Sequence, residues 1–178
     1  DSRVLTIPVV YNTSSFDSLE ALSLMRGKVD VYLADFKYAS ALEAGKLSHA
    51  PRYPEIALAA IEEMIAQVPV WEEDDEGLLL KGVIVRHLVL PGRVEESKRA
   101  LATLHDRFGG SVRLSIMSQY TPLASGLERY GLAGRVTEEE YEEVLDYADS
   151  LGVEDYFWQQ GDAAQESFVP EFNGEGVR

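Results

Sequence analysis

Asp35 and Lys37 form the residue pair with the clearest chemical potential, because they are two positions apart at the end of an apolar run. In an extended segment, residues two apart project from the same face, so the pair presents a hydrogen-bond acceptor beside a cation. This arrangement suits a ligand with hydroxyl and carboxylate groups, or a metal together with an anion. An internal ion pair that closes the strand end explains the same pattern equally well.

Arg86 and His87 interrupt another apolar run. A buried guanidinium needs a carboxylate or phosphate partner, because leaving it unpaired is costly. We expect Asp35 on a neighbouring strand, or a ligand carboxylate, to be that partner. His87 falls on the opposite face of the same strand, so we expect a hydrogen-bonded structural histidine that does not share a pocket with Arg86.

The composition excludes several classes of protein. The 178 residues carry a formal net charge of −15, which argues against non-specific binding of nucleic acid or anionic membranes. The absence of cysteine excludes a disulfide framework, a thiolate metal site and a cysteine nucleophile from this chain. The three histidines are too scattered to suggest a metal site, and no Walker loop, nucleophile elbow or dinucleotide glycine motif is present. We expect a cytoplasmic protein.

Four apolar, β-branched runs must position the polar residues, and a helical pattern follows each of them. The runs are residues 7–11, 29–36, 82–90 and 112–117. The helices are expected near Leu19 to Met25, from Tyr53 to Gln67, from Val94 to Phe108, and from Thr137 to Leu151, where Thr137 and Glu140 fit a capping box. This alternation predicts parallel strands with crossover helices, and the nearly continuous apolar strands favour a sheet covered on both faces. A barrel, a partial barrel and an open doubly wound sheet all remain compatible with the pattern.

In parallel βα folds, ligands bind at the carboxyl ends of the strands. Polar residues gather at all four predicted ends, namely Asn12 and Thr13, Asp35 and Lys37, Arg86, and Gln119 with Tyr120. We therefore expect these side chains to line one ligand-binding mouth.

Two further segments depart from the alternation. Residues 70–80 place an acidic turn between apolar flanks, which predicts a small hairpin leading into the third strand. Residues 156–178 contain enough aromatic side chains that we expect this tail to pack along the wall of the domain or to cover an opening.

Four segments in joint order resemble the carboxyl-terminal part of radical S-adenosylmethionine proteins, and most of all the pyruvate formate-lyase activating enzyme-like group. They are VVYNTSSFD at 9–17, VDVYLADFKY at 29–38, VRHLVLPG at 85–92 and MSQY at 117–120. The resemblance covers almost the whole chain, including FVPEF at 168–172.

The resemblance implies an α/β fold in which residues 1–178 form the carboxyl-terminal part of a partial (β/α)6 TIM-like barrel, with parallel strands, outer helices and a tail at 156–178. It implies a parent oxidoreductase in which a 4Fe-4S cluster cleaves S-adenosylmethionine reductively for hydrogen abstraction, with a reductant such as flavodoxin or ferredoxin. It also implies which residues face the S-adenosylmethionine, namely Asn12, Thr13, Asp35, Lys37, Arg86, Gln119 and Tyr120.

The family's C-x-x-x-C-x-x-C loop is absent and would precede Asp1, so we expect a fragment that is inactive alone, with an unknown radical acceptor. Two other hypotheses stand beside this one. Lys37 could form an imine in an aldolase-like barrel. Alternatively, a non-catalytic half-barrel could bind a partner or a second copy through its exposed edge strand, residues 7–11.

Overall fold

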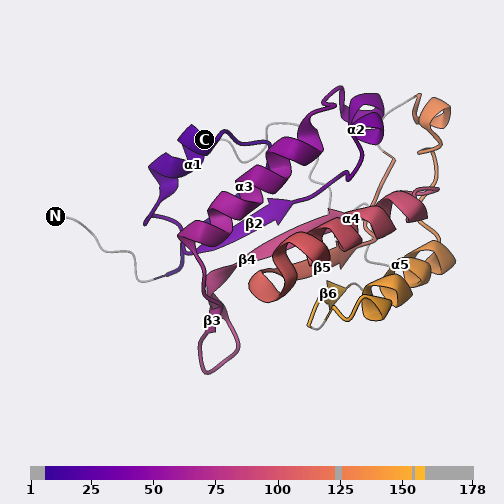
Figure 1. Ribbon diagram of the computed structural model, residues 1–178. Coiled ribbons are helices and arrows are strands. Elements are labelled where there is room, and N and C mark those ends of the chain that lie inside the picture. The colour runs from indigo at the N-terminus through magenta and orange to yellow at the C-terminus, as the bar shows by residue number, and fades with distance from the viewer. Residues whose placement is uncertain (1–6, 123–125, 154, 159–178) are drawn as a thin grey trace, which may run out of the picture.

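A six-stranded sheet covered by helices forms the centre of the computed structural model, which describes residues 7–122, 126–153 and 155–158 (Figure 1). Neighbouring parallel strands follow chain order: β1 (Val10–Thr13), β2 (Val31–Asp35), β4 (Leu79–Leu88), β5 (Arg113–Met117) and β6 (Phe157–Trp158). The short strand β3 (Glu72–Glu73) pairs antiparallel with β4. The sheet therefore confirms the predicted α/β class and its parallel strands.

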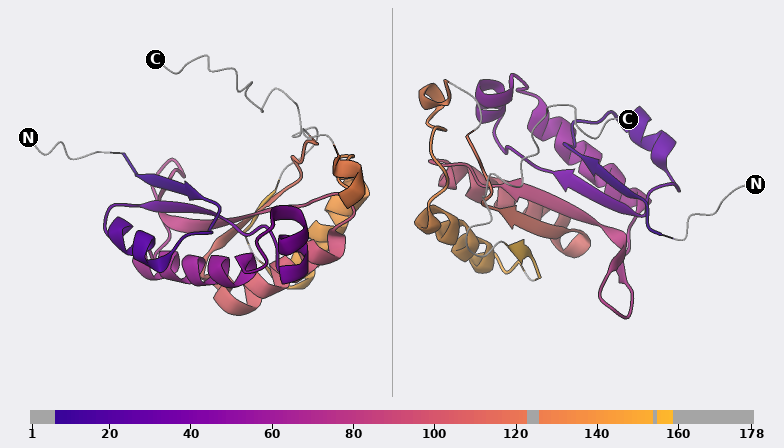
Figure 2. Two further views of the ribbon diagram at one scale, coloured as in Figure 1. Left: turned by 90° about the horizontal axis from the view of Figure 1, so that it is seen from above. Right: turned by 180° about the vertical axis from the view of Figure 1, so that it is seen from behind.

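Four helices lie against one face of the curved sheet (Figure 2). They are α1 (Leu19–Met25), α3 (Tyr53–Gln67), α4 (Val94–Phe108) and α5 (Glu138–Ser150). The short helix α2 (Ala41–Ser48) lies between β2 and α3, and two 3-10 turns cover Gly109–Ser111 and Leu127–Tyr130. None of the helices in the described ranges combines the length and the apolar character that crossing a membrane requires.

Side-chain alternation gives the sheet two different faces. Residues that point toward the helices are buried in one core, including Tyr32 and Ala34 of β2, Val83 and Val85 of β4, and Ile116 of β5. The alternate residues stay partly exposed on the opposite side, which we call the open face: Leu33, Asp35, Ile84, Arg86, Ser115 and Met117. The expectation of a sheet covered on both faces is wrong for the described residues, because their helices cover only one.

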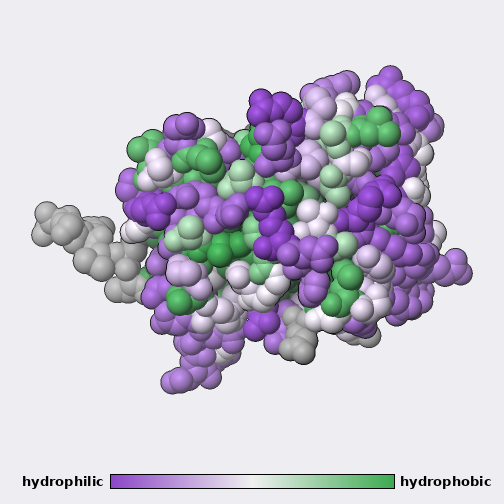
Figure 3. Space-filling model, in the orientation of Figure 1, coloured by the Kyte–Doolittle hydropathy of each residue, from purple (hydrophilic) through white to green (hydrophobic). Residues whose placement is uncertain are grey.

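The helices are amphipathic, because one side of each is buried against the sheet and the other faces solvent. Seen from the helix-covered side, hydrophilic residues surround separate hydrophobic patches (Figure 3). The inward side chains of α4 show the complementary pattern, because Ala100, Leu101 and Leu104 are fully buried.

Several sequence predictions are confirmed. Helices α3 and α4 have the expected bounds, and Thr137 and Glu140 form the predicted capping box at α5. Gly27, which follows the first helix, has a left-handed φ of 72°, as is common where a helix ends. The acidic segment does form a hairpin, in which β3 returns onto β4.

Other predictions need correction. The first strand spans Val10–Thr13 and not residues 7–11, although it is an edge strand, as expected. Strand β4 begins at Leu79, three residues before the predicted run. Helix α2 and strand β6 were not predicted, since each is short and lacks a long apolar stripe. Of the tail expected at 156–178, the structure describes only residues 156–158, which include β6, so the expected packing of residues 159–178 lies outside the described ranges.

The hairpin presses a tryptophan against the sheet at the amino-terminal end of β4. A Cβ atom at Gly82 would lie 2.6 Å from Cε3 of Trp71, so no side chain fits between the indole and the strand. Arg113 lies on the neighbouring strand β5, and its guanidinium is 5.3 Å from the centre of the Trp71 ring. These contacts fix the hairpin at the amino-terminal end of β4, and the predicted ligand mouth is at the opposite end of the strands.

We expect Gly82→Ala to lower the free energy of unfolding by about 1–3 kcal/mol, because the added methyl group overpacks this contact. Urea titration followed by circular dichroism measures the change. In a Trp71→Ala background the same substitution should cost much less, since the clashing ring is gone. Equal losses in both backgrounds would contradict the proposed contact.

Candidate functional site

Parallel register brings three predicted site residues onto the open face of adjacent strands. Asp35 of β2 stands opposite Arg86 of β4, and Arg86 stands opposite Ser115 of β5. Asn12 of β1 stands opposite Leu33, which shares the face of Asp35. The three polar side chains thus lie at the carboxyl ends of neighbouring strands, where ligands of such folds bind.

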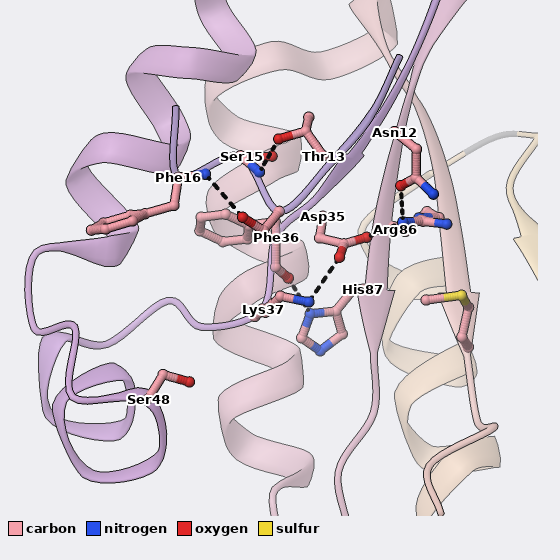
Figure 4. A network of polar contacts seen from close by, with 12 residues as sticks. Asn12, Thr13, Ser15, Phe16, Asp35, Phe36, Lys37, Ser48, Arg86 and His87 are labelled. Carbon is pink, nitrogen blue, oxygen red and sulfur yellow. Dashed lines mark hydrogen bonds and ion pairs between the residues drawn. The ribbon is translucent and has the colours of Figure 1, made fainter. Parts of the chain in front are cut away.

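These side chains form one linked network with Lys37 (Figure 4). Arg86 Nε and Nη2 lie 2.8 and 2.7 Å from Asp35 Oδ1, and Arg86 Nη2 also donates to Asn12 Oδ1 at 2.7 Å. Lys37 Nζ donates to Asp35 Oδ2 at 2.7 Å. Of the two partners considered for Arg86, the structure thus shows Asp35, and Asp35 also forms with Lys37 the internal ion pair that was the alternative to ligand binding.

The network has more positive than negative charge, although the chain is strongly acidic. Asp35 carries one negative charge between the positive charges of Lys37 and Arg86. The side chains of Asp35 and Arg86 are 17% and 25% exposed, whereas that of Lys37 is 42% exposed. Both oxygens of Asp35 already accept hydrogen bonds from these cations. Lysine and arginine side chains can only donate, so the groups that Lys37 and Arg86 can still offer to a ligand are N–H donors. An anionic group is the natural complement of such a site.

Tyr53 of α3 supports the network from the helix-covered side. Its hydroxyl accepts a hydrogen bond from Lys37 N at 2.9 Å and lies 2.9 Å from the carbonyl oxygen of Asp35 and 3.0 Å from that of Ser14. Burial raises the pKa of the Tyr53 hydroxyl, which therefore remains protonated and able to donate. One side chain thus joins the ends of β1 and β2.

Glu96 of α4 is a buried carboxylate beside the same loop. Its Oε1 accepts hydrogen bonds from Ala39 N at 2.8 Å and Ser40 N at 2.7 Å, and its Oε2 lies 2.7 Å from Arg99 Nη2. Burial acts to raise the pKa of Glu96, but the hydrogen bonds from Ser40, Arg99 and Ala39 together hold it below its ordinary value. Glu96 is therefore a charged acceptor for two consecutive backbone amides.

His87 is buried on the opposite side of β4 from Arg86, as predicted. Its Nδ1 lies 2.8 Å from the carbonyl oxygen of Phe36, and its Nε2 lies 3.0 Å from Ser97 Oγ. The carbonyl can only accept, so Nδ1 carries the proton and Nε2 accepts from the serine. His87 is a structural residue that fixes the end of β2.

Three of the predicted site residues lie apart from the network. Thr13 points to the other face of β1, where its hydroxyl bonds the carboxylate of Asp17 and accepts from Ser15 N. The exposed Gln119 lies with its Nε2 3.7 Å from Met117 Sδ. Tyr120 donates its hydroxyl to the carbonyl oxygen of Leu132 at 2.9 Å.

Sequence reasoning missed Tyr53 and Glu96, because both lie within ordinary amphipathic helices where tyrosine and glutamate carry no special signal. It also missed Ser15, which follows β1 with a left-handed φ of 61°. The Ser15 hydroxyl is buried without a hydrogen-bond partner in the part of the chain that the structure describes. Across the same residues, no group of three or more histidine, aspartate or glutamate side chains is placed to hold a metal ion.

Comparison with known proteins adds one relative. No family model matches the chain. The chain is 28% identical over 148 residues to an uncharacterized protein of Methanocaldococcus jannaschii. The match covers 83% of this chain and 40% of that protein, so the chain spans well under half the length of the relative. The similarity assigns no activity.

We expect His87 to make folding stability depend on pH. Burial lowers the pKa of His87 from its ordinary 6.5, so below about pH 6.5 the unfolded chain takes up a proton that the folded chain does not. The free energy of unfolding should therefore fall as the pH drops from 7 to 5, by up to about 1 kcal/mol per pH unit from this residue.

Urea titrations at several pH values measure this slope. His87→Gln should make the slope shallower, whereas His49→Asn, at an exposed helix end, should leave it unchanged. Identical slopes in the wild type and in His87→Gln would show that His87 is not the responsible group.

Proposed function

We propose that this chain is the S-adenosylmethionine-facing part of a radical S-adenosylmethionine enzyme similar to pyruvate formate-lyase activating enzyme. The observation that carries the proposal is the linked row of Asn12, Asp35, Lys37 and Arg86 on the open face at the carboxyl ends of the strands. The quoted sequence resemblance selects these four residues, together with Thr13, Gln119 and Tyr120, which lie apart from the row.

The arrangement of the sheet supports a partial barrel. Neighbouring parallel strands follow chain order, and four helices lie on one side (Figure 2). A barrel wall needs this order, because each crossover must move in the same direction around the sheet. A doubly wound sheet instead reverses its strand order and places helices on both faces.

The network fits the chemistry of S-adenosylmethionine, which carries a carboxylate, an ammonium group and ribose hydroxyls. In this proposal, the remaining N–H donors of Lys37 and Arg86 receive the carboxylate. Asp35 keeps both cations in place, and Asn12 fixes the outer end of the Arg86 guanidinium. Holding these donors in position before binding reduces the side-chain entropy that the protein loses when the ligand binds.

The residues of this chain do not fit an iron-sulfur cluster, because it contains no cysteine. When bound in an enzyme of this class, the cluster supplies the electron for reductive cleavage of the sulfonium. The cluster ligands would come from outside these 178 residues, and the resemblance implies a reductant such as flavodoxin or ferredoxin.

The lysine-imine alternative receives less support. An imine-forming lysine attacks through a free nitrogen lone pair, whereas Lys37 Nζ lies 2.7 Å from Asp35 Oδ2 in an ion pair that would first have to open. The side chain is also 42% exposed, so it is not enclosed in an apolar pocket of the kind that activates such lysines. Borohydride trapping with small aldehydes, followed by mass spectrometry, tests this alternative directly.

Anaerobic reconstitution tests the main proposal. We expect the 178-residue chain to take up no stoichiometric iron and sulfide, and a form extended upstream of Asp1 to bind both and to release 5′-deoxyadenosine from S-adenosylmethionine with a reductant. Cluster formation by the short chain, or failure of a cluster-loaded extended form to cleave S-adenosylmethionine, would refute the proposal.

In the extended form, we expect Arg86→Gln to raise KM for S-adenosylmethionine at least about 10-fold, because it removes a charged donor whose hydrogen bond is worth about 1.5–3 kcal/mol. Arg113→Gln is the matched control, since this arginine lies on the same face beside Trp71. We expect Arg113→Gln to leave KM unchanged. Equal effects of the two substitutions would exclude a specific role for Arg86.

A further inference from the structure

We propose that Glu96 is a positioning residue for Lys37, which it holds against Asp35 by fixing the backbone of residues 39 and 40. The inference deepens the proposed function, and rests on it for the identity of the ligand. Its structural part concerns only contacts within this chain, so it is testable whatever the ligand is.

Side chains, more than the sheet, hold the segment that carries Lys37. After β2 ends, Phe36 N still donates to Arg86 O at 2.8 Å, which is the last ladder bond. Beyond it, His87 binds Phe36 O, Tyr53 binds Lys37 N, and Glu96 binds the amides of Ala39 and Ser40. Three different elements, β4, α3 and α4, thus hold four of the five residues from 36 to 40.

Glu96 differs from the other two supports because it is charged. Only 6% of its side chain is exposed, and burying a carboxylate is unfavourable unless strong donors compensate. Two amides converge on Oε1, and Arg99 neutralises Oε2. Hydrogen bonds to an ionised acceptor are about twice as strong as neutral ones, so this contact resists opening of the loop.

The position of Lys37 follows from this support. Its side chain turns back two residues to reach Asp35 Oδ2, which requires a fixed backbone on both sides of residue 37. Tyr53 fixes residue 37 itself, while Glu96 fixes the chain where it turns into α2 at Ser40, the cap of that helix. If the backbone of residues 39 and 40 loses its hydrogen bonds to Glu96, Lys37 gains conformations in which its side chain points into solvent. These conformations compete with the ion pair between Lys37 and Asp35.

A labelling experiment on the 178-residue chain tests the structural part. Glu96→Ala should speed hydrogen exchange at residues 39 and 40 at least about 10-fold, and acetic anhydride should acylate Lys37 about 3-fold faster relative to Lys46 and Lys81 in the same sample. Glu96→Gln keeps one acceptor oxygen and should fall between Glu96→Ala and the wild type. The control is Glu95→Gln, at an exposed neighbouring position, and should match the wild type.

Circular dichroism establishes that each variant is folded, and Glu96→Gln provides the readout if Glu96→Ala does not fold. Unchanged exchange and acylation in a folded Glu96 variant would overturn the inference.

The extended form adds a functional readout. Glu96→Gln should raise KM for S-adenosylmethionine about 3- to 10-fold, with a smaller change in kcat, because the side chain acts through a binding residue. Faster acylation of Lys37 with an unchanged KM would overturn the positioning role. If the cluster-loaded wild type does not cleave S-adenosylmethionine at all, the proposed function fails, while the exchange and acylation data still decide whether Glu96 holds Lys37.

Discussion

The register between β2 and β4 is the constraint on which the site depends. Tyr32 and Ala34 bury their side chains against the helices, as do Val83 and Val85, and this forces Asp35 and Arg86 together onto the open face. A slip of either strand by one residue would expose the apolar side chains of that strand and turn its charged group toward the core. The burial of apolar side chains thus fixes the position of the ion pair between Asp35 and Arg86.

At the carboxyl ends of the strands, the two faces of the sheet carry different kinds of polar groups. On the open face, Lys37 and Arg86 are partly exposed, so some of their N–H donors can face solvent. On the helix-covered face, the polar groups of His87, Tyr53 and Glu96 are matched to backbone atoms of the strand ends. Buried groups of this kind are unfavourable unless they are satisfied, so their geometry admits few alternatives. The satisfied polar groups on the helix-covered face therefore fix the strand ends that carry the network on the open face.

The sequence allowed the prediction of features with a local physical signature. Helices α3 and α4 have long apolar stripes, the capping box has a fixed spacing, and alternation placed Asp35 and Lys37 together and Arg86 apart from His87. Sequence could not reveal the supports, because the roles of Tyr53 and Glu96 depend on which loop packs against them. Thr13 was assigned to the site by its place at a strand end, yet alternation turns it away from Asn12. A strand end therefore predicts a region, and only the register predicts which residue faces a ligand.

The net charge of the whole chain and the local charge of the network favour different features of a ligand. A net charge of −15 creates a field that repels anions at long range, yet the network itself carries an excess positive charge. A simple anion would be attracted only at contact distance. S-adenosylmethionine combines a sulfonium and an ammonium group with one carboxylate, so its net positive charge suits the field of the whole chain while its carboxylate suits the cations of the network. A ligand with both signs of charge satisfies both conditions, whereas a purely anionic ligand satisfies only the local one.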